Sequence, residues 1–231
     1  MDHTFDWKPR FDERSKAYPV RDTIATPPKK RNKLWKIGPI LDQGSEGACV
    51  GFGWSAEAFS TPVAVDLSRV RADVPRTPNQ FALNTYHTAQ KLDEWSGEAY
   101  DGTSVLAGAK ALQQFGLLKE YRWAFSIEDV VDTILAKGPV VLGIHWFDGM
   151  YEAPNGVLSV SGPMVGGHCI AAVGFRLASD KLGGEDGIIL QNSWGADWGM
   201  KGLAEIRVSD LAALLNEDGE ACVPSRRSYG R

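Results

Sequence analysis

Apolar residues recur every three to four positions in the first half of the chain, and this spacing predicts four amphipathic helices. The expected helices cover residues 48–59, a segment that starts at residue 77, residues 104–116 and residues 126–137. Three of them start with residues typical of a helix N-terminus, namely Thr77 followed by Pro78, Ser104 and Ser126. Asp129 stands three residues after Ser126, and this pair resembles a capping box.

Beyond Gly138 the pattern changes to short runs that are β-branched or alternate between apolar and polar residues, as is typical of strands. The expected strands are residues 140–145, 156–160, 168–175, 187–191 and 203–208. The Asn155-Gly156 pair is a strong signal for a hairpin turn. A last short helix is expected at residues 210–215, with Ser209 as its N-cap.

Helices followed by strands indicate an α+β protein with two lobes rather than an alternating α/β sheet. We therefore divide the chain into a basic N-terminal arm, a helical lobe, a β lobe and a C-terminal tail. These parts cover residues 1–34, 35–120, 121–217 and 218–231, respectively.

The composition is that of an ordinary globular protein, with 231 residues of which 43% are hydrophobic and 23% are charged. Three cysteines, Cys49, Cys169 and Cys222, allow at most one disulfide and exclude a disulfide-rich scaffold. The first 36 residues contain no apolar run of the kind that a signal peptide needs. The densest apolar stretch, residues 140–144, is too short to span a bilayer. We therefore expect a cytoplasmic protein with no membrane partner, or one packaged in a virus particle.

Charge is unevenly distributed along the chain. Residues 1–36 contain ten basic and five acidic residues, a net charge of +5, whereas the remainder contains 15 and 24, a net charge of −9. The basic run at residues 27–33 is of the kind that can bind nucleic acid. No aromatic residues are interleaved with these charges, so we prefer a solvated linker and expect no nucleic-acid partner. A basic arm lying on its own acidic body is the third interpretation.

The motifs of the common cofactor and metal sites do not occur in the sequence. Gly51, Gly53 and Ala56 fit a dinucleotide-binding pattern, but the preceding residues 41–47 are turn-like and no βαβ unit follows. The sequence has no phosphate-binding loop, no serine-hydrolase elbow and no zinc-protease motif. With four histidines and no paired cysteines, a structural zinc site is not expected. We predict a protein that uses neither cofactor nor metal.

Cys49 stands after a glycine-rich turn, at a predicted helix N-terminus that would direct backbone N–H groups at its sulfur. That environment lowers the pKa of a thiol and favours the thiolate, which is the nucleophile. A thiolate nucleophile also needs a general base and a third group that orients the base. His168, in a predicted strand, and Asn192, at the end of the next one, supply these residue types. Singly, each is more often a packing residue, but together they indicate nucleophilic catalysis.

The motifs around these residues resemble those of the papain-like cysteine peptidases. They are QGSEGAC at residues 43–49, Gly167-His168, NSWG at residues 192–195 and the nearby Trp198-Gly199. Gln43 stands six residues before Cys49, His168 follows Cys49 by 119 residues, and Asn192 follows His168 by 24. The resemblance covers about residues 35–208. Within the family, the chain looks like the bacterial or phage-type members. It implies a helical lobe packed against an antiparallel, β-barrel-like lobe.

The resemblance also implies a cysteine-type endopeptidase that hydrolyses peptide bonds through a thioester acyl-enzyme. Cys49 would attack the scissile carbonyl, and His168 would act first as base and then as acid. Asn192 would hold the imidazole ring of His168 in place. Gln43 and the backbone N–H of Cys49 would form the oxyanion hole.

Three substrate-binding residues follow from the same resemblance. Gly102 falls where the family uses a glycine-containing strand to hold the substrate backbone, and Gly167 directly precedes the histidine. Trp194 would shield the hydrogen bond between His168 and Asn192 from water. The expected partner is a peptide or protein substrate.

Two residues depart from the family pattern. Glu46 replaces the cysteine that usually stands three residues before the nucleophile, so the usual disulfide cannot form, and Val50 replaces an aromatic residue. Glu46 would either compete electrostatically for His168 or face the cleft and select basic substrates. Cys169 would point to the opposite face of the strand from His168 and pack in the core.

Only 48 residues precede Cys49, fewer than the family's long pro-segment requires, so we expect no activation by propeptide removal. As a hypothesis, the basic arm partly covers the acidic body and limits access to the cleft. Two alternative functions stay open. One is acyl transfer or deamidation on the same triad, and the other is a non-catalytic binding or assembly protein that keeps the fold.

Overall fold

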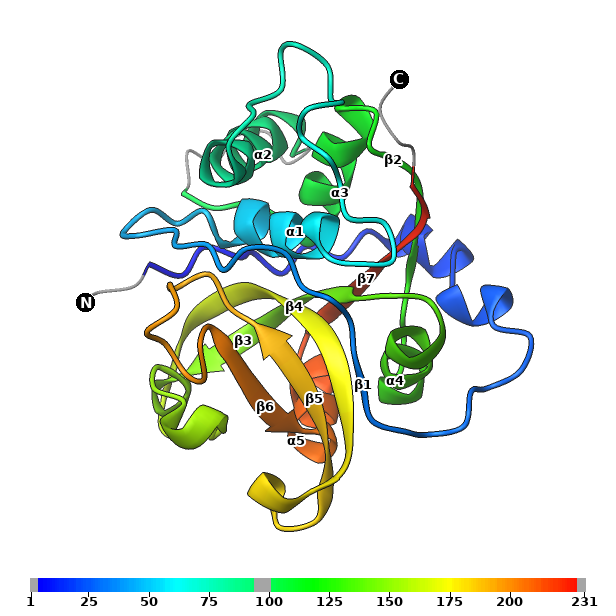
Figure 1. The fold of residues 1–231 in the computed structure, drawn as a ribbon, viewed down its shortest axis with the longest axis vertical. Helices are drawn as coiled ribbons and strands as arrows, with labels where there is room; N and C mark the ends of the chain where they lie inside the picture. Colours follow the sequence, from blue (N-terminus) through cyan, green and yellow to red (C-terminus); the bar gives the residue numbers. More distant parts are fainter. Residues whose placement is uncertain (1–3, 94–100, 228–231) are drawn as a thin grey trace.

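A seven-stranded antiparallel sheet organises the residues described by the computed structural model, which are 4–93 and 101–227 (Figure 1). The strand order is β2–β7–β3–β4–β5–β6, and the short β1 pairs with β4. The strands are β1 Lys33–Leu34, β2 Leu118–Trp123, β3 Val140–Phe147, β4 Met164–Ser179, β5 Glu185–Gln191, β6 Leu203–Arg207 and β7 Glu220–Arg227. Strands from both ends of the chain therefore meet in one sheet.

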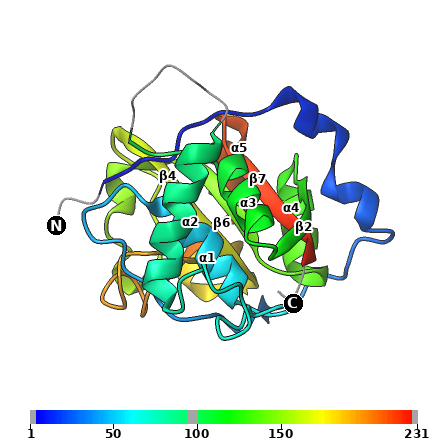
Figure 2. The same cartoon turned by 90° about the horizontal axis from the view of Figure 1, so that it is seen from above.

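Five α-helices cover the two faces of this sheet. They are α1 Cys49–Phe59, α2 Pro78–Leu92, α3 Val105–Gln114, α4 Ile127–Ala136 and α5 Val208–Asn216. The first three form a layer on one face, and α4 and α5 pack on the other (Figures 1 and 2). This arrangement confirms the predicted α+β class. Within the described part of the chain, no helix is long and apolar enough to cross a membrane.

Each face of the sheet has its own core, because side chains alternate along β3. Val140, Leu142 and Ile144 belong to the core shared with α4 and α5. Val141 belongs to the core shared with α1, α2 and α3, as does Cys169 on the neighbouring β4. The helical layer and the sheet meet on this second face, where Cys49 lies, whereas the His168 ring contacts Trp146 and Trp194 of the first core.

The predicted helix starts are confirmed at two positions. The Ser104 hydroxyl accepts a hydrogen bond from the Ala107 N–H, and the Ser126 hydroxyl accepts one from the Asp129 N–H. Thr77 precedes α2 without a side-chain cap. The prediction for the last helix is wrong in detail, because α5 begins at Val208 and Ser209 lies inside it.

Two predictions about strands are wrong. The segment 156–160 forms no strand, because Asn155 adopts a left-handed φ of 59° within a short 3-10 turn, Pro154–Gly156, and only Val157 makes an isolated bridge. The tail expected at 218–231 contains β7, which pairs with β2 and β3. Its residues 221–223 are buried, so a short apolar run near the end of the chain supplies a central strand.

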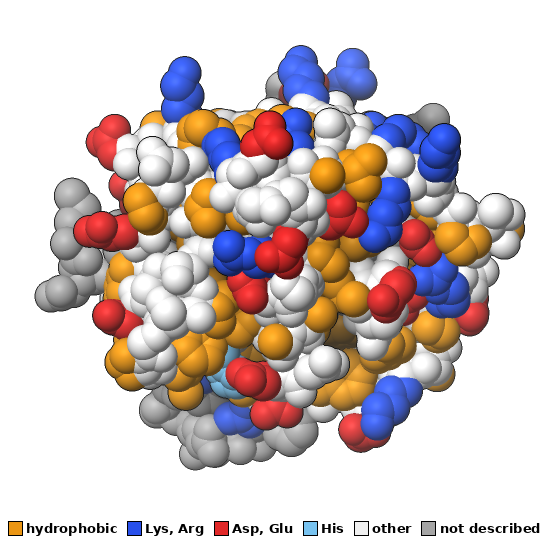
Figure 3. All heavy atoms as spheres, turned by 90° about the horizontal axis from the view of Figure 1, so that it is seen from below, with side chains coloured by type: hydrophobic (Ala, Val, Ile, Leu, Met, Phe, Trp, Pro, Cys, Tyr) orange, Lys and Arg blue, Asp and Glu red, His pale blue; other side chains and the backbone are white. Residues whose placement is uncertain are grey.

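The N-terminal arm lies on the body instead of extending from it. Lys33–Leu34 pair with β4 as β1, and the Lys30 ammonium lies 2.9 Å from the Asp186 carboxylate. On the face drawn in Figure 3, basic and acidic side chains are interspersed with apolar ones. The folded structure thus mixes charges that the sequence separates.

A buried ion pair joins β7 to the helical layer, and it supplies a test of the packing. Arg227 pairs with Glu57 of α1, and each side chain is only 5% exposed. We expect Glu57→Gln to reduce the free energy of unfolding by about 3–5 kcal/mol, because it leaves a buried guanidinium unpaired. The double variant Glu57→Leu/Arg227→Met should lose clearly less of its free energy of unfolding, because it leaves no buried charge unpaired. Urea unfolding measures both, and equal losses in the two variants would contradict the pairing.

Candidate active site

Cys49 is the first residue of α1 and is fully buried. The helix lies very close to β4, because a methyl group added at Gly53, one turn further on, would lie 2.8 Å from the Cys169 sulfur. A backbone N–H of Cys169 also hydrogen-bonds the Cys49 sulfur. Since Cys169 directly follows His168, this packing sets the start of α1 against the strand that carries the predicted base.

His168 and Asn192 meet because their strands are neighbours. His168 lies on β4, and Asn192 directly follows β5, which pairs with β4. The His168 Nε2 and the Asn192 Oδ1 are 2.8 Å apart, and both side chains are buried. Asn192 Oδ1 also accepts the N–H of Ser193 at 2.8 Å, which fixes the amide. The structure therefore places the orienting group where the resemblance implies it.

Aromatic rings surround this pair. Trp194 lies 5.1 Å from the His168 ring, measured between centroids, and Trp146 lies 4.7 Å from it in an edge-on arrangement. Both indoles are buried, so they exclude water from the hydrogen bond between His168 and Asn192. Trp146 was absent from the sequence prediction, although it follows directly on a predicted strand.

Gln43 is buried, and its side chain is hydrogen-bonded to the loop after β5. Its Oε1 accepts a hydrogen bond from the Ser193 hydroxyl at 2.7 Å. Its Nε2 donates to the carbonyl of Glu46 at 2.9 Å and to that of Thr4 at 3.4 Å. The predicted oxyanion donor thus faces the backbone of the N-terminal residues.

Residues 4–10, which we call the cleft segment, run between the helical layer and the sheet (Figures 1 and 2). The Trp7 N–H donates to the Gly167 carbonyl at 2.9 Å. Thr103 accepts the Lys8 N–H at 3.2 Å and donates its own N–H to the Asp6 carbonyl at 3.1 Å. The cleft segment therefore occupies Gly167 and the backbone next to Gly102, two of the predicted substrate-binding positions.

Aromatic side chains anchor the cleft segment on both sides of Cys49. Phe5 packs edge-on against His168, at 5.9 Å between ring centroids, and against Trp194 at 5.7 Å. Trp7 is 2% exposed and packs over Gly143 and Gly167, where any side chain would collide with it. The sequence gives no short-range signal for this placement.

Burial under the cleft segment raises the pKa of the Cys49 thiol to about 11. Backbone N–H groups of Asp6, Cys169 and Trp7 act against this shift, and the Asp6 carboxylate adds to it. The expectation of a lowered thiol pKa is wrong for this closed conformation. The reason is that the loss of water around the sulfur outweighs the N–H groups that face it.

Glu46 and Cys169 contact the site residues through their backbone, whereas the side chains of Glu46, Cys169 and Cys222 make no hydrogen bond to them. The Glu46 carboxylate lies 3.3 Å from the His87 ring of α2, is 43% exposed, and does not compete for His168. Cys169 and Cys222 are buried free thiols. Among the described residues, no cluster of histidine, cysteine or acidic side chains could hold a metal ion.

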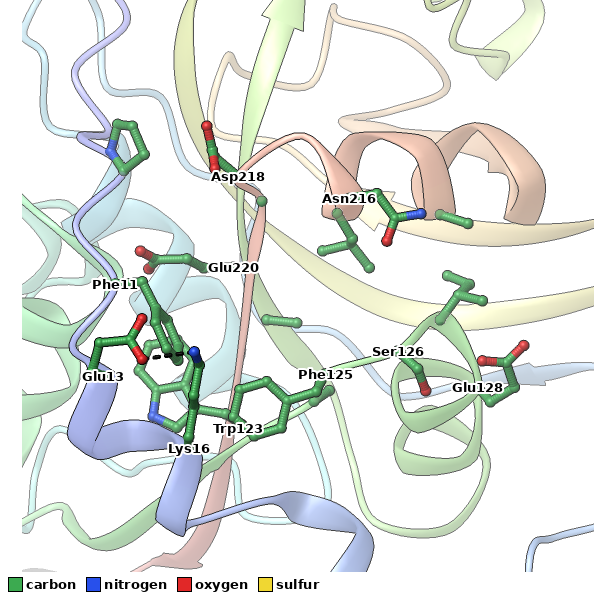
Figure 4. Close-up of a pocket in the computed structure, with 17 residues that line it drawn as sticks. Phe11, Glu13, Lys16, Trp123, Phe125, Ser126, Glu128, Asn216, Asp218 and Glu220 are labelled. Carbon is green, nitrogen blue, oxygen red and sulfur yellow. Dashed lines mark ion pairs between the residues drawn. The ribbon is translucent and has the colours of Figure 1, made fainter.

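A cavity of about 700 Å³ lies further along the N-terminal residues (Figure 4). Phe11, Trp123, Phe125 and Glu220 contribute to its lining, whereas the catalytic residues do not. The open space thus lies beyond the cleft, because the cleft segment fills the space in front of Cys49.

Comparison with known families agrees with this geometry. The family described as papain family cysteine protease matches residues 82–218, more than half of the chain. The chain therefore belongs to the papain family of cysteine proteases. The matched range includes His168 and Asn192, whereas Gln43 and Cys49 lie before it.

The curated relatives are distant and longer. An uncharacterised peptidase C1-like protein of Acanthamoeba polyphaga mimivirus is 21% identical over 206 residues, covering 70% of this chain and 62% of that protein. Cathepsin Q of Rattus norvegicus is 28% identical over 88 residues, covering 34% of this chain and 24% of the cathepsin. The chain thus spans less than two thirds of the length of these relatives.

Solved structures share the fold at low sequence identity. Xylellain, a cysteine protease from Xylella fastidiosa, has a TM-score of 0.63 and 15% identity, covering 98% of this chain and 96% of its own. Procathepsin L 3 from the larval midgut of Tenebrio molitor has a TM-score of 0.60 and 17% identity, covering 87% and 72%. These similarities confirm the papain-like fold.

The buried thiol gives a prediction for chemical labelling. We expect iodoacetamide to modify Cys49 slowly at neutral pH, because the thiol is covered and its pKa is about 11. Phe5→Ala should speed the labelling by loosening the cleft segment. Peptide mapping separates Cys49 from the other two thiols. Fast labelling of the unmodified sequence at pH 6 would contradict the closed conformation.

Proposed function

We propose that the chain is a cysteine endopeptidase that hydrolyses peptide bonds through a thioester on Cys49. The observation that carries this proposal is the buried 2.8 Å contact between His168 Nε2 and Asn192 Oδ1, on the strand whose Cys169 N–H hydrogen-bonds the Cys49 sulfur. A nucleophile, a base and an orienting group are the set that acyl transfer to sulfur requires. The proposed substrate is a peptide or protein.

Each group has a distinct role in the proposed reaction. His168 takes the thiol proton, and the Cys49 sulfur attacks the scissile carbonyl carbon. Gln43 Nε2 and the Cys49 backbone N–H donate to the oxyanion of the tetrahedral intermediate. His168 then protonates the departing amine, and water hydrolyses the thioester. Asn192 keeps the imidazole in one orientation throughout.

The cleft segment is not placed as a substrate. Backbone N–H groups of Asp6 and Trp7 face the Cys49 sulfur, whereas the reaction needs a carbonyl carbon there. The Asp6 carbonyl points away, to the N–H of Thr103. The segment therefore blocks the nucleophile without offering it a bond to cleave, and turnover requires that it leaves the cleft.

Two substitutions test the catalytic roles. Cys49→Ala should abolish cleavage of an unfolded protein such as denatured casein, because no thioester can form. Asn192→Ala should lower kcat at least about tenfold, with little change in KM, because the base loses its orientation. Mass spectrometry of the products gives the rates and the cleaved bonds. If Cys49→Ala cleaves as fast as the unmodified sequence, the proposal is wrong.

The blocking role of the cleft segment has a separate test. Phe5→Ala should raise kcat/KM about tenfold or more, because a partly buried aromatic anchor is lost from the closed state only. Phe125→Ala, which removes a 47% exposed ring outside the cleft, is the matched control. A purely structural segment predicts the opposite, a fall in activity that follows the fall in melting temperature.

A further inference from the structure

The cleft segment buries two carboxyl groups, one of its own and one on the sheet. Asp6 belongs to the segment and is 7% exposed, with its Oδ2 against Gly47 and without a hydrogen-bond partner there. Glu220 belongs to β7 and is 4% exposed. Neither carboxyl group is needed to block Cys49, since the backbone of Asp6 and Trp7 already faces its sulfur.

The cleft segment forms the lid over Glu220. The Glu220 Oε1 accepts the backbone N–H of Arg10 at 3.2 Å, whereas Oε2 has no hydrogen-bond partner among the described residues. In Figure 4 the carboxyl group points from β7 toward Phe11. Withdrawal of the segment would therefore expose Glu220 to water.

The charged and titratable groups around Asp6 do not offset its burial. Lys8, on the same segment, lies 4.0 Å away and favours the carboxylate. Asp101 and the Cys49 thiol face Asp6 from the helical layer, and Asp101 disfavours the carboxylate. Burial is the largest influence, and it raises the pKa of Asp6.

One neighbouring charge makes the ionisation of Glu220 harder still, namely Asp93 at the end of α2, and the Arg10 N–H acts in the other direction. The buried thiols of Cys169 and Cys222 also face Glu220, and both are neutral where it ionises. Burial raises the pKa of Glu220 from its ordinary 4.5 to about 8. The covered carboxyl groups thus hold protons that they would release in water.

This difference couples closure of the cleft to pH. A carboxyl group whose pKa is higher when covered favours the covered state fully at a pH below its uncovered pKa. That contribution is lost as the pH rises through the covered pKa. For Glu220 the window extends from about 4.5 to about 8, and Asp6, whose pKa is also raised by burial, acts with the same sign.

We propose that the cleft segment is a proton-dependent latch, which closes the active site in acid and releases it as Asp6 and Glu220 ionise at higher pH. The effect on turnover rests on the proposed peptidase function, whereas the movement of the segment does not. The direction is set by geometry, because both carboxyl groups lose their water only when the segment is in place.

Hydrogen–deuterium exchange of the full chain tests the latch without relying on activity. Glu220→Gln and Asp6→Asn keep the shape of the protonated groups and remove their charge. At about pH 8 the peptide covering residues 4–10 should exchange about tenfold faster in the unmodified sequence than in Glu220→Gln, and at about pH 5 the two should agree. Asp6→Asn should likewise slow the exchange of residues 4–10 at pH 8 relative to the unmodified sequence. Comparing proteins at one pH removes the intrinsic pH dependence of exchange.

Glu217→Gln makes the same change of charge at an exposed position near β7 and should behave like the unmodified sequence. Equal exchange of residues 4–10 in all four proteins at both pH values would overturn the latch, as would slower exchange of the unmodified sequence at pH 8.

Casein cleavage at pH 8 should fall about tenfold in Glu220→Gln. Altered exchange with no cleavage by any protein would uphold the latch and contradict the peptidase. Cleavage with unaltered exchange would uphold the peptidase and contradict the latch.

Discussion

The close packing of α1 against β4 is the constraint on which the site depends. Gly53 permits this approach, because any side chain there would collide with Cys169, and all eleven residues of α1 are buried. Cys49 begins the helix, and His168 directly precedes Cys169 on the strand. A small separation of the two elements would therefore move the nucleophile away from its base, so the rest of the helical layer serves to hold one helix end in place.

The same burial has opposite effects on the two halves of the catalytic pair. Around His168 and Asn192, the indoles of Trp146 and Trp194 remove water and strengthen a hydrogen bond that is already made. Around Cys49, the loss of water raises the pKa of the thiol and disfavours the nucleophilic thiolate. The aromatic cover of the base comes from β3 and from the loop after β5, whereas the cover of the sulfur includes the backbone of the cleft segment.

Local signals in the sequence predicted local structure correctly, but they did not predict contacts between residues that are far apart in the chain. Ser104 and Ser126 mark helix starts correctly, because a cap involves residues only three positions apart. The family motifs predicted four catalytic residues, of which the structure brings His168 and Asn192 into contact. The strand β7 and the cleft segment were missed, since each is defined by partners far away in the chain. Trp7, for example, depends on Gly167, and the polar surroundings of residues 4–10 resemble those of a solvated arm.

The closed conformation of the cleft depends on favourable and unfavourable free-energy contributions of comparable size. Burying an aromatic side chain contributes about 1.5–3 kcal/mol, and Phe5 and Trp7 supply two of them. Each unit by which burial raises a carboxyl pKa opposes closure by about 1.4 kcal/mol once that group would otherwise be ionised. Because Asp6 and Glu220 both carry such shifts, their ionisation removes at least as much of the binding free energy as one aromatic anchor contributes. A segment held by apolar contacts alone would stay closed at every pH, whereas one that also buries two acids can open while the protein remains folded.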